Sequence, residues 1–493
     1  MSYASDDPLP MLTREEILAV YAAGPEAVVA LVESLLARLA QQEAETAALT
    51  ARVTALEARL AKDSHNSSKP PASDGLTKRT KSLRAPTGKK PGGQPGHPGA
   101  TLRLADRPDA LIVHAPPTCR GCGASLAGVP ACRQERRQLH ELPPLQLVVS
   151  EHQTFAKVCP RCLTLTAAAF PAGLSQPVQY GPGVKALAVY LQEYQLLPFA
   201  RTHELLADLF GCSLSEGTLA TALATAAARL APVQAAIQAA LVDAAVAHFD
   251  ETGVRIGAQT QWLHHAGTQR LTCYAVHPQR GKGATEAIGI LPAFTGTAVH
   301  DGWSAYASYP CEHALCNAHH LRELTFVAEQ TQQPWASDLI ALLLEIKQAV
   351  EVAQSAGESC LSAAGRAAFE GRYAALVEAG LAANPPLPPT GKRGRPKQSA
   401  AKNLLDRLDR QRDSVLAFMT NFAVPFDNNL AERDLRMVKV RQKISGCFRT
   451  PSGATAFCCL RGYISTLRKQ GQHVLTALQT VFAGQPLMPE LRG

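Results

Sequence analysis

A seam of apolar residues near the N-terminus constrains the fold of this chain most strongly. Its members follow one another in steps of four and three, which keeps them on one side of a helix and favours a left-handed coiled coil. A polar residue in such a seam fixes the register. The pattern predicts a long helix that self-associates, and the alternative is an amphipathic helix packed on its own protein. The seam consists of Val28, Val32, Leu35, Leu39, Gln42, Thr46, Leu49, Val53, Leu56 and Leu60.

The sequence that follows the seam is basic and rich in Pro and Gly. Such a composition sustains neither a helix nor a central strand. We therefore expect a linker over residues 63–110, and its charge suits a flexible arm that contacts DNA phosphates and folds on binding. Lys69, Lys89 and Lys90 are candidate phosphate contacts. The net charge of +8 over 493 residues agrees with a polyanionic partner without establishing one.

Two close pairs of cysteines predict a structural zinc site. The pairs Cys119-x-x-Cys122 and Cys159-x-x-Cys162 can close a tetrahedron of thiolates around one Zn²⁺. The chain has no run of about 20 apolar residues and no export signal, so we expect a reduced, cytoplasmic protein that contacts no membrane. Alternation in 145–149 and 153–158 favours a β-hairpin that joins the pairs. Residues 111–172 are therefore predicted to be a zinc ribbon, and two turns without metal are the alternative.

Residues 173–240 are predicted to be helical. A helix over His203–Gly211, a short polar break and a second helix from Thr218 are typical of a helix-turn-helix unit that binds DNA. Any helical hairpin has a similar pattern, and the second helix is mostly Ala, Thr and Leu, which read few base edges. Both interpretations therefore stand.

The pattern then changes to short strands. Three strands, a helix and a fourth strand follow one another, which is the order of a ribonuclease-H-like sheet with its first and fourth strands side by side. The first and fourth strands carry Asp250 and Asp301, so we expect these carboxylates to face each other near the ends of neighbouring strands. Glu251 points to the opposite face, because successive strand residues alternate. The predicted strands are 245–254, 261–267, 271–277 and 297–302, with the helix near 285–291.

A third carboxylate is usually needed to hold two divalent ions for phosphoryl transfer. Glu432 is the candidate, in the first turns of a helix capped by Asp427 or Asn428. Asp427 is a rival ligand, but the oxygens of a helix cap are occupied by backbone N–H groups. Lys439 lies two turns after Glu432 near the same helix face, where it can hold a DNA phosphate. The helix carries the densest basic cluster of the chain, formed by Arg433, Arg436, Lys439, Arg441 and Lys443.

The long interval between Asp301 and Glu432 predicts a helical insertion with its own small core. It contains a Pro-rich basic loop in which Arg393-Gly394-Arg395-Pro396 is similar to an AT-hook, a segment that lays arginines into the minor groove. A plain basic linker is the alternative. Cys316-x-x-His319 can bind a metal together with Cys311 or His313, but a helix that starts after a strand explains the same pattern.

Several of these motifs resemble the large transposase subunit of the insertion-sequence-sixty-six family, and the resemblance covers nearly the whole chain. One departure is Val254, where an aromatic residue is more usual. The most diagnostic motif is Asn-Asn-x-Ala-Glu-Arg-x-Leu-Arg, followed by Lys-Ile-Ser-Gly-Cys. The resembling segments are Asp63–Gly75, the two cysteine pairs, His248–Gly253, His300–Tyr306, Cys316–Arg322 and Asp427–Cys447.

The resemblance implies a DDE-type enzyme that cleaves DNA at the ends of an insertion sequence and transfers the strand to target DNA. It implies Asp250, Asp301 and Glu432 as catalytic residues and ligands of two Mg²⁺ or Mn²⁺ ions. It further implies that His319 and Arg322 contact DNA. The expected partners are double-stranded DNA, further copies of the chain and accessory proteins of the same element. A non-catalytic DNA-binding regulator and a structure-specific nuclease without strand transfer are the alternatives.

We therefore expect a multidomain α+β protein. A coiled-coil helix (1–62) and the linker (63–110) precede the zinc ribbon (111–172) and the helix-turn-helix-like region (173–240). A ribonuclease-H-like core (241–320 and 421–470) is interrupted by the helical insertion (321–420) and followed by a tail (471–493). No phosphate-cradling Gly-x-x-x-x-Gly-Lys-Ser/Thr loop is present, so no ATP is implied.

Overall fold

The computed structural model describes residues 13–67, 96, 101–387 and 398–492. The chain divides into two compact units, each made of two sequence segments. The helical unit comprises Met1–Leu83 and Leu315–Asp427, and the sheet unit comprises Arg84–Ala314 and Asn428–Gly493. The protein is a mixed α and β structure. Within the described ranges, no helix has the length and apolar character that a membrane span requires.

The predicted N-terminal helix is confirmed. α1 (Arg14–Ala22) starts with a capping box between Thr13 and Glu16, and α2 (Pro25–Leu60) contains every seam position. Seven of the apolar seam side chains are at least 45% exposed, so the seam is a largely apolar exposed face on α2, interrupted by Gln42 and Thr46. The seven side chains are Val32, Leu35, Leu39, Leu49, Val53, Leu56 and Leu60.

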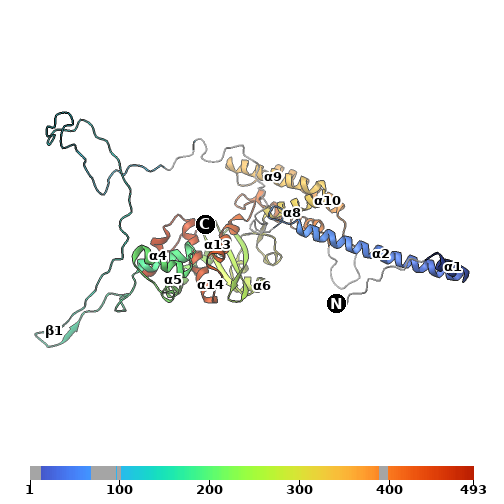
Figure 1. The fold of residues 1–493 in the computed structure, drawn as a ribbon, viewed down its shortest axis with the longest axis horizontal. Helices are drawn as coiled ribbons and strands as arrows, with labels where there is room; N and C mark the ends of the chain where they lie inside the picture. Colours follow the sequence, from blue (N-terminus) through green and yellow to red (C-terminus); the bar gives the residue numbers. More distant parts are fainter. Residues whose placement is uncertain (1–12, 68–95, 97–100, 388–397, 493) are drawn as a thin grey trace. The chain divides into compact units, whose positions relative to one another are not determined.

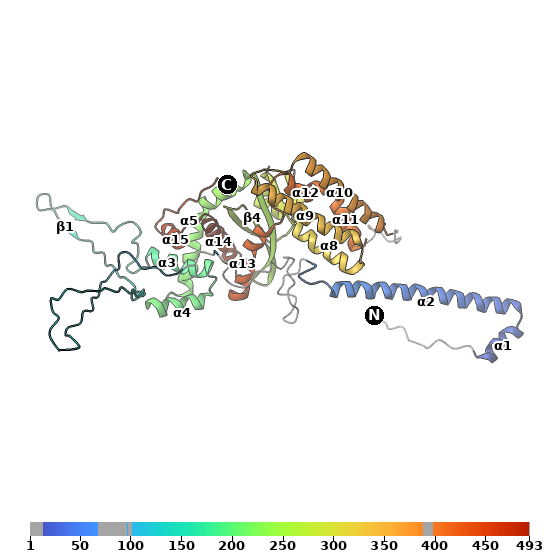
Figure 2. The same ribbon diagram turned by 90° about the horizontal axis from the view of Figure 1, so that it is seen from above.

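The rest of the helical unit is a bundle of helices, in agreement with the helical pattern of this segment. α9 packs against both α8 and α10 (Figures 1 and 2). Gly380 of α10 allows a close approach, because a Cβ there would lie 2.5 Å from Leu405 and 3.0 Å from Trp335. The helices are α8 (Asn317–Thr331), α9 (Pro334–Ser355), α10 (Ala363–Ala383), α11 (Ala400–Arg410) and α12 (Arg412–Thr420).

The turn after α2 is attached to α8. Asn66 is 4% exposed, and its Nδ2 donates to Glu329 of α8 at 2.9 Å and to the Ala61 carbonyl at 3.1 Å. The Lys62 ammonium lies 4.8 Å from the centre of the Phe326 ring, also on α8. The beginning of the predicted linker is therefore an ordered turn that joins α2 to the bundle.

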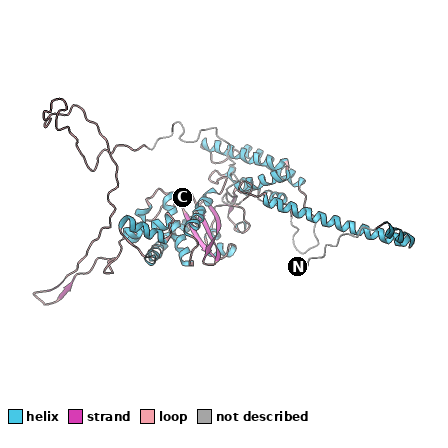
Figure 3. Ribbon diagram, viewed as in Figure 1, coloured by secondary structure: helices cyan, strands magenta, loops and turns pink. Residues whose placement is uncertain are grey.

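The sheet unit is built around a five-stranded mixed sheet, drawn in Figure 3 as the group of magenta arrows near the C-terminus label. Its order is β5-β4-β3-β6-β7; β3 pairs antiparallel with β4 and parallel with β6. The predicted pairing of the first and fourth strands is therefore confirmed. The strands are β3 (Val246–Ile256), β4 (Gln259–Gly267), β5 (Thr272–His277), β6 (Thr297–His300) and β7 (Glu312–Leu315).

Helices cover both faces of this sheet because the strands are apolar on both sides. Phe249 faces the core shared with α5 and α7, whereas Val254 and Leu263 face the core shared with α13. α14 contributes to both cores. The helices are α5 (Glu216–Val242), α6 (Lys282–Ile288), α7 (Ile290–Ala293), α13 (Asn429–Ser445) and α14 (Pro451–Lys469).

The predicted helical pair before the sheet is confirmed. α4 (Phe199–Phe210) ends at Gly211, whose φ of 61° is left-handed, and Ser215 caps α5. α4 follows α3 (Pro182–Val189) and the π-helical turn Tyr190–Tyr194. We expected residues 471–493 to form a tail. They instead contain a helix, α15 (Val474–Phe482), which buries one face in the core shared with α5.

The hairpin expected between the cysteine pairs is wrong. Residues 145–149 form no strand, and the short hairpin of β1 (Ala156–Val158) and β2 (Leu165–Ala167) instead brackets the second pair. Val148 and Val149 are 81% and 85% exposed. Alternation predicts a strand only where a second strand pairs with it, and residues 145–149 have no such partner in the described chain.

Candidate active site

Asp250 lies on the central strand β3, where burial is the first cause that raises its pKa well above the usual value. The negative charges of Glu251 and Asp301 add to this increase, and Glu432 adds a smaller part. The Glu251 backbone N–H donates to Asp250 Oδ1 at 2.8 Å, which fixes one carboxylate oxygen. The three predicted acids therefore share one electrostatic neighbourhood in the sheet unit. Their oxygens do not form one group within 4.8 Å among the described residues.

Asp301 follows the last residue of β6, at a sharp turn. Gly302 has a φ of 86°, a left-handed value that favours glycine. The Trp303 backbone N–H donates to Asp301 Oδ1 at 2.9 Å, and the Gly302 N–H donates to His300 Nδ1 at 3.0 Å. The backbone of the turn therefore holds the side chains of both His300, the last residue of β6, and Asp301, the residue after it.

Glu432 lies in the first turn of α13, and the start of this helix is tied to β3. Asn428 is 1% exposed; its Oδ1 lies 2.7 Å from Nδ1 of His248, and its Nδ2 donates to the Phe249 carbonyl at 3.0 Å. Asn428 is the N-cap residue, but its side chain makes no cap hydrogen bond. It connects the helix that carries Glu432 to the strand that carries Asp250, a role that sequence reasoning missed.

A second acid of α13 serves a different purpose. Asp434 Oδ2 accepts from Lys469 of α14 at 2.8 Å and lies 3.0 Å from His265 Nε2 on β4. Burial alone would raise the pKa of Asp434, but His265 and Lys469 lower it to about 2. Asp434 therefore anchors α13 to the sheet and to α14. No spacing in the sequence indicates this network.

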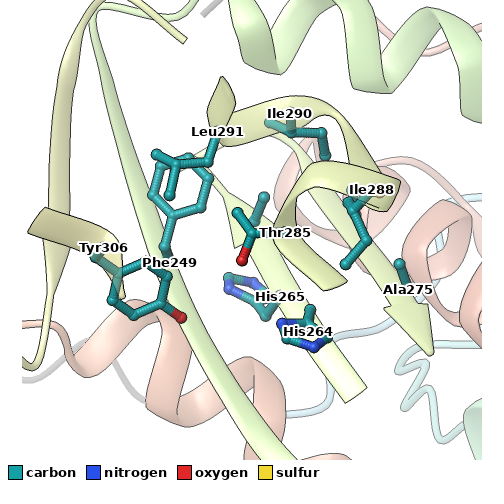
Figure 4. A pocket seen from close by; sticks show the side chains of 11 residues that line it. Phe249, His264, His265, Ala275, Thr285, Ile288, Ile290, Leu291 and Tyr306 are labelled. Carbon is teal, nitrogen blue, oxygen red and sulfur yellow. The ribbon is translucent and has the colours of Figure 1, made fainter. Parts of the chain in front are cut away.

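Glu251 faces away from Asp250, as strand alternation predicts. Its side chain is 1% exposed and is paired with Arg280. On the same face, a cavity of about 30 Å³ lies between the sheet and the α6–α7 segment, and Figure 4 shows Phe249 and Tyr306 beside each other at its edge. This cavity is apolar and has room for about one water molecule, so it is no nucleotide site.

Most of the predicted basic cluster forms an exposed stripe along α13. Arg436, Lys439 and Lys443 follow Glu432 by four, seven and eleven residues, a spacing that keeps them on its helix face. The Lys439 ammonium also donates to the Gly253 carbonyl at 2.6 Å. Arg433 is exposed one position after Glu432. Arg441 differs, because its guanidinium lies 3.8 Å from the Phe448 ring centre; packing accounts for its position, and its DNA contact stays a prediction.

The four predicted zinc ligands form two similar turns. The N–H groups of Cys119 and Cys159 donate to the carbonyls of Ala124 and Thr164 at 2.8 and 3.0 Å. Hydrogen bonds from the backbone of Cys122 and Gly121, and then from the Cys122 thiol, lower the pKa of Cys119. In the second turn, the Thr164 hydroxyl is the main cause that lowers the pKa of Cys162. Among the described residues, the four sulfurs do not form a single cluster.

His319 and Arg322 are two further predicted DNA contacts. Both are half-buried on α8 of the helical unit, one turn from each other. Cys316 precedes α8 as its N-cap, so a helix does start after a strand here. Cys316 and His319 also belong to a group of possible metal ligands among the described residues, so the metal-binding alternative stays open. His313 lies 3.1 Å from His300 and 3.0 Å from the Tyr309 carbonyl through its two ring nitrogens. Five predicted contacts fall outside the described residues: Lys69, Lys89, Lys90, Arg393 and Arg395.

Comparison with protein families identifies the class of protein. A family model described as "Transposase IS66 family" matches residues 177–456, more than half of the chain, and it defines a class of DNA-processing enzymes. The protein is therefore a transposase and acts on DNA. It belongs to the IS66 family of transposases. A second model, described as a family of unknown function (DUF6444), matches residues 21–103. No curated protein matches the sequence closely enough to count as a relative.

Proposed function

We propose that this transposase is a DDE-type enzyme that cuts DNA at the ends of an insertion sequence and joins the exposed 3′ end to target DNA. Asp250, Asp301 and Glu432 are its catalytic carboxylates. The observation that carries the proposal is geometric: β6 pairs with β3, and Asn428 ties the start of α13 to β3, so the elements that carry the three acids meet. The charges of Asp301 and Glu432 accordingly help to raise the pKa of Asp250. Repulsion among clustered carboxylates is offset by a bound proton or by a cation, and perturbed acids of this kind are concentrated at functional sites.

The donor set fits two Mg²⁺ or Mn²⁺ ions. Carboxylate oxygens are the ligands that Mg²⁺ prefers, and the excess negative charge around Asp250 is what a divalent cation neutralises. When bound, such ions lower the pKa of water and stabilise charge on the attacking and leaving oxygens. The protein's own groups orient the carboxylates: the N–H groups of Glu251 and Trp303 each fix one oxygen of Asp250 and Asp301.

The strand order supports a ribonuclease-H-like core over 241–320 and 421–470. Three antiparallel strands precede the α6–α7 segment, and β6 then returns parallel to β3. The exposed stripe of Arg436, Lys439 and Lys443 continues the face of Glu432 along α13, which suits a DNA backbone that leads away from the carboxylates. We infer that Arg433 contributes to the same contact.

Two further modules belong to the proposal. The apolar seam of α2 would be covered by a second copy of the chain in a coiled coil, since two ends of an element must be joined together. The two cysteine turns would hold one structural Zn²⁺ through Cys119, Cys122, Cys159 and Cys162, because lowered thiol pKa values favour the thiolate that zinc binds.

A strand-transfer assay tests the proposed function. The substrate is labelled DNA that carries the ends of the element encoding this chain, together with plasmid target and Mg²⁺. We expect joined product from the wild type, and neither cuts nor joined product from Asp250→Asn, Asp301→Asn or Glu432→Gln. DNA affinity without metal should persist in all three. Cuts without joining would indicate a nuclease, and binding alone would indicate a regulator.

A further inference from the structure

The carboxylate of Glu251 is engaged at both oxygens although it lies outside the proposed catalytic set. Oε1 accepts from Arg280 Nε at 2.7 Å and lies 2.6 Å from Arg280 Nη2. Oε2 accepts from the hydroxyl of Tyr306. Burial raises the pKa of Glu251, and the hydrogen bonds from Tyr306 and Arg280 oppose this increase. The Glu251 carboxylate is nearly inaccessible and accepts hydrogen bonds at both oxygens. It therefore connects β3 firmly to Arg280, which precedes α6, and to Tyr306, which follows β6.

Arg280 is held by aromatic rings as well as by Glu251. Its guanidinium carbon lies 4.4 Å from the ring centre of Trp303 and 4.9 Å from that of Trp262. Two of the three tryptophans in the chain therefore contact one arginine. Trp262 is on β4, opposite Gly253 of β3, whereas Trp303 follows Asp301 by two residues. The arginine thus joins the sheet to the turn that carries Asp301.

Tyr306 makes the second connection to the same turn. It is 4% exposed, and its ring lies 4.9 Å from His300, 5.5 Å from Trp303 and 6.5 Å from Phe249. Apart from the 3₁₀ turn Tyr306–Ser308, residues 301–309 have no regular backbone structure. Ordering such a segment costs about 1–2 kcal/mol per residue, which side-chain contacts must offset.

We propose that Glu251 is a positioning residue that holds the segment 301–309 against β3 and so fixes Asp301 relative to Asp250. The connection runs from Glu251 through Tyr306 and Arg280 to Trp303, whose backbone N–H holds the Asp301 carboxylate. Asp250 is the neighbour of Glu251 on the same strand. The inference rests on the proposed function, because it assumes that Asp250 and Asp301 bind the same metal ions.

Two conservative variants remove this connection. Glu251→Gln removes the charge, and Tyr306→Phe removes only the hydroxyl. In the metal-free full-length protein, we expect hydrogen–deuterium exchange of the peptide 302–308 to become about ten-fold faster in both, the effect of one lost charge-assisted hydrogen bond. We also expect Mn²⁺ affinity, measured from the electron paramagnetic resonance signal of free Mn²⁺, to weaken about ten-fold, since metal sites tolerate displacements of only about 0.5 Å.

Tyr309→Phe is the matched control. Its hydroxyl belongs to the same segment and also donates to a glutamate, but that residue is Glu286 of α6, at 3.2 Å. We expect exchange of 302–308 and Mn²⁺ affinity to stay within about two-fold of the wild type, because Glu251 keeps both donors. If Tyr309→Phe acts like Tyr306→Phe, the segment is loosened generally and the specific role of Glu251 is wrong.

The outcomes separate this inference from the proposed function. Wild-type exchange and wild-type Mn²⁺ affinity in folded Glu251→Gln and Tyr306→Phe proteins would overturn the positioning role. If Asp250→Asn and Asp301→Asn leave Mn²⁺ binding unchanged, the proposed metal site is wrong. The exchange measurement needs no metal, so it decides in that case whether Glu251 holds the segment.

Discussion

The side chain of Asn428 joins the start of α13 to His248 of β3, with 2.7 Å between Asn428 Oδ1 and His248 Nδ1. A second bond from Asn428 Nδ2 to the Phe249 carbonyl reinforces this connection. These contacts lie between the strand of Asp250 and the helix of Glu432. The distance between Asp250 and Glu432 therefore depends on the side-chain amide of Asn428.

Replacement of Asn428 should affect both stability and activity. Asn428→Ala removes the bonds that Asn428 makes to the buried imidazole of His248 and to the Phe249 carbonyl. We expect this loss to cost about 1–3 kcal/mol in urea unfolding and to reduce DNA cleavage strongly. Asn403→Ala is the control, because that exposed asparagine makes a comparable bond to the Gln398 carbonyl. Equal stability of the two variants would contradict the role of Asn428.

The Asp434–Lys469 pair should behave as a structural ion pair. Asp434→Asn leaves the Lys469 ammonium, 15% exposed, without its carboxylate, so we expect a loss of about 3 kcal/mol of unfolding free energy. The double variant Asp434→Asn/Lys469→Met should recover part of that loss, because no unpaired charge remains. Additive losses in this double-mutant cycle would show that the two side chains are not coupled.

Glu193 predicts a pH dependence of stability. Burial raises the pKa of Glu193 from 4.5 to about 7, against the opposing charges of Arg441 and Arg461. Between pH 4.5 and about pH 7, Glu193 keeps its proton in the folded protein but loses it in the unfolded chain. The free energy of unfolding therefore falls as the pH rises and levels off above about pH 7. Glu193→Gln should remove this fall, a difference on the order of 3 kcal/mol between pH 4 and pH 8.

Denaturant unfolding at each pH measures this difference between wild type and variant. Glu204→Gln, a change at an exposed position of α4, should reproduce the wild-type curve. Parallel curves for the wild type and Glu193→Gln would contradict a raised pKa.

The seam of α2 predicts self-association that depends on one helix face. Leu35 lies in the seam and is 45% exposed, whereas its neighbour Leu36 lies outside it and is 58% exposed. Leu35→Lys should shift the protein towards the monomer in sedimentation velocity, and Leu36→Lys should not, although it exposes the same charge. Equal behaviour of the two variants would argue against a coiled coil.

Zinc content tests the cysteine turns. The purified protein should contain zinc in a ratio near one per chain by elemental analysis, and Cys159→Ser should lose it, because the remaining three thiolates leave the tetrahedron incomplete. Cys132→Ser should keep the metal, since Cys132 is an exposed cysteine outside both pairs. Zinc retained in Cys159→Ser would exclude the predicted ligand set.

Periodic patterns predicted the elements of this fold well. The four–three spacing of the seam predicted α2, and strand alternation predicted that Asp250 and Glu251 point to opposite faces. Both patterns reflect the local backbone, which repeats its geometry every few residues. The neighbouring positions of β3 and β6 were predicted from the order of three strands, a helix and a fourth strand.

Contacts between side chains remote in sequence were not predictable in this way. His248 and Asn428 are 180 residues apart, and His265 and Asp434 are 169 apart, so no local period relates them. Alternation predicted a strand over residues 145–149, but these residues form none, because no second strand of the described chain pairs with them. α15 was missed because its short apolar pattern follows a glycine and resembles a tail.

The sheet unit is assembled from two stretches of polypeptide, with β3 and β6 before the inserted helices and α13 and α14 after them. During synthesis on the ribosome, Asp250 and Asp301 emerge long before Glu432 and the lysine that pairs with Asp434. A nascent chain therefore lacks the third proposed acid until the first turn of α13 has left the exit tunnel. If these acids cut DNA as proposed, the order of translation delays cutting until α13 has been synthesised.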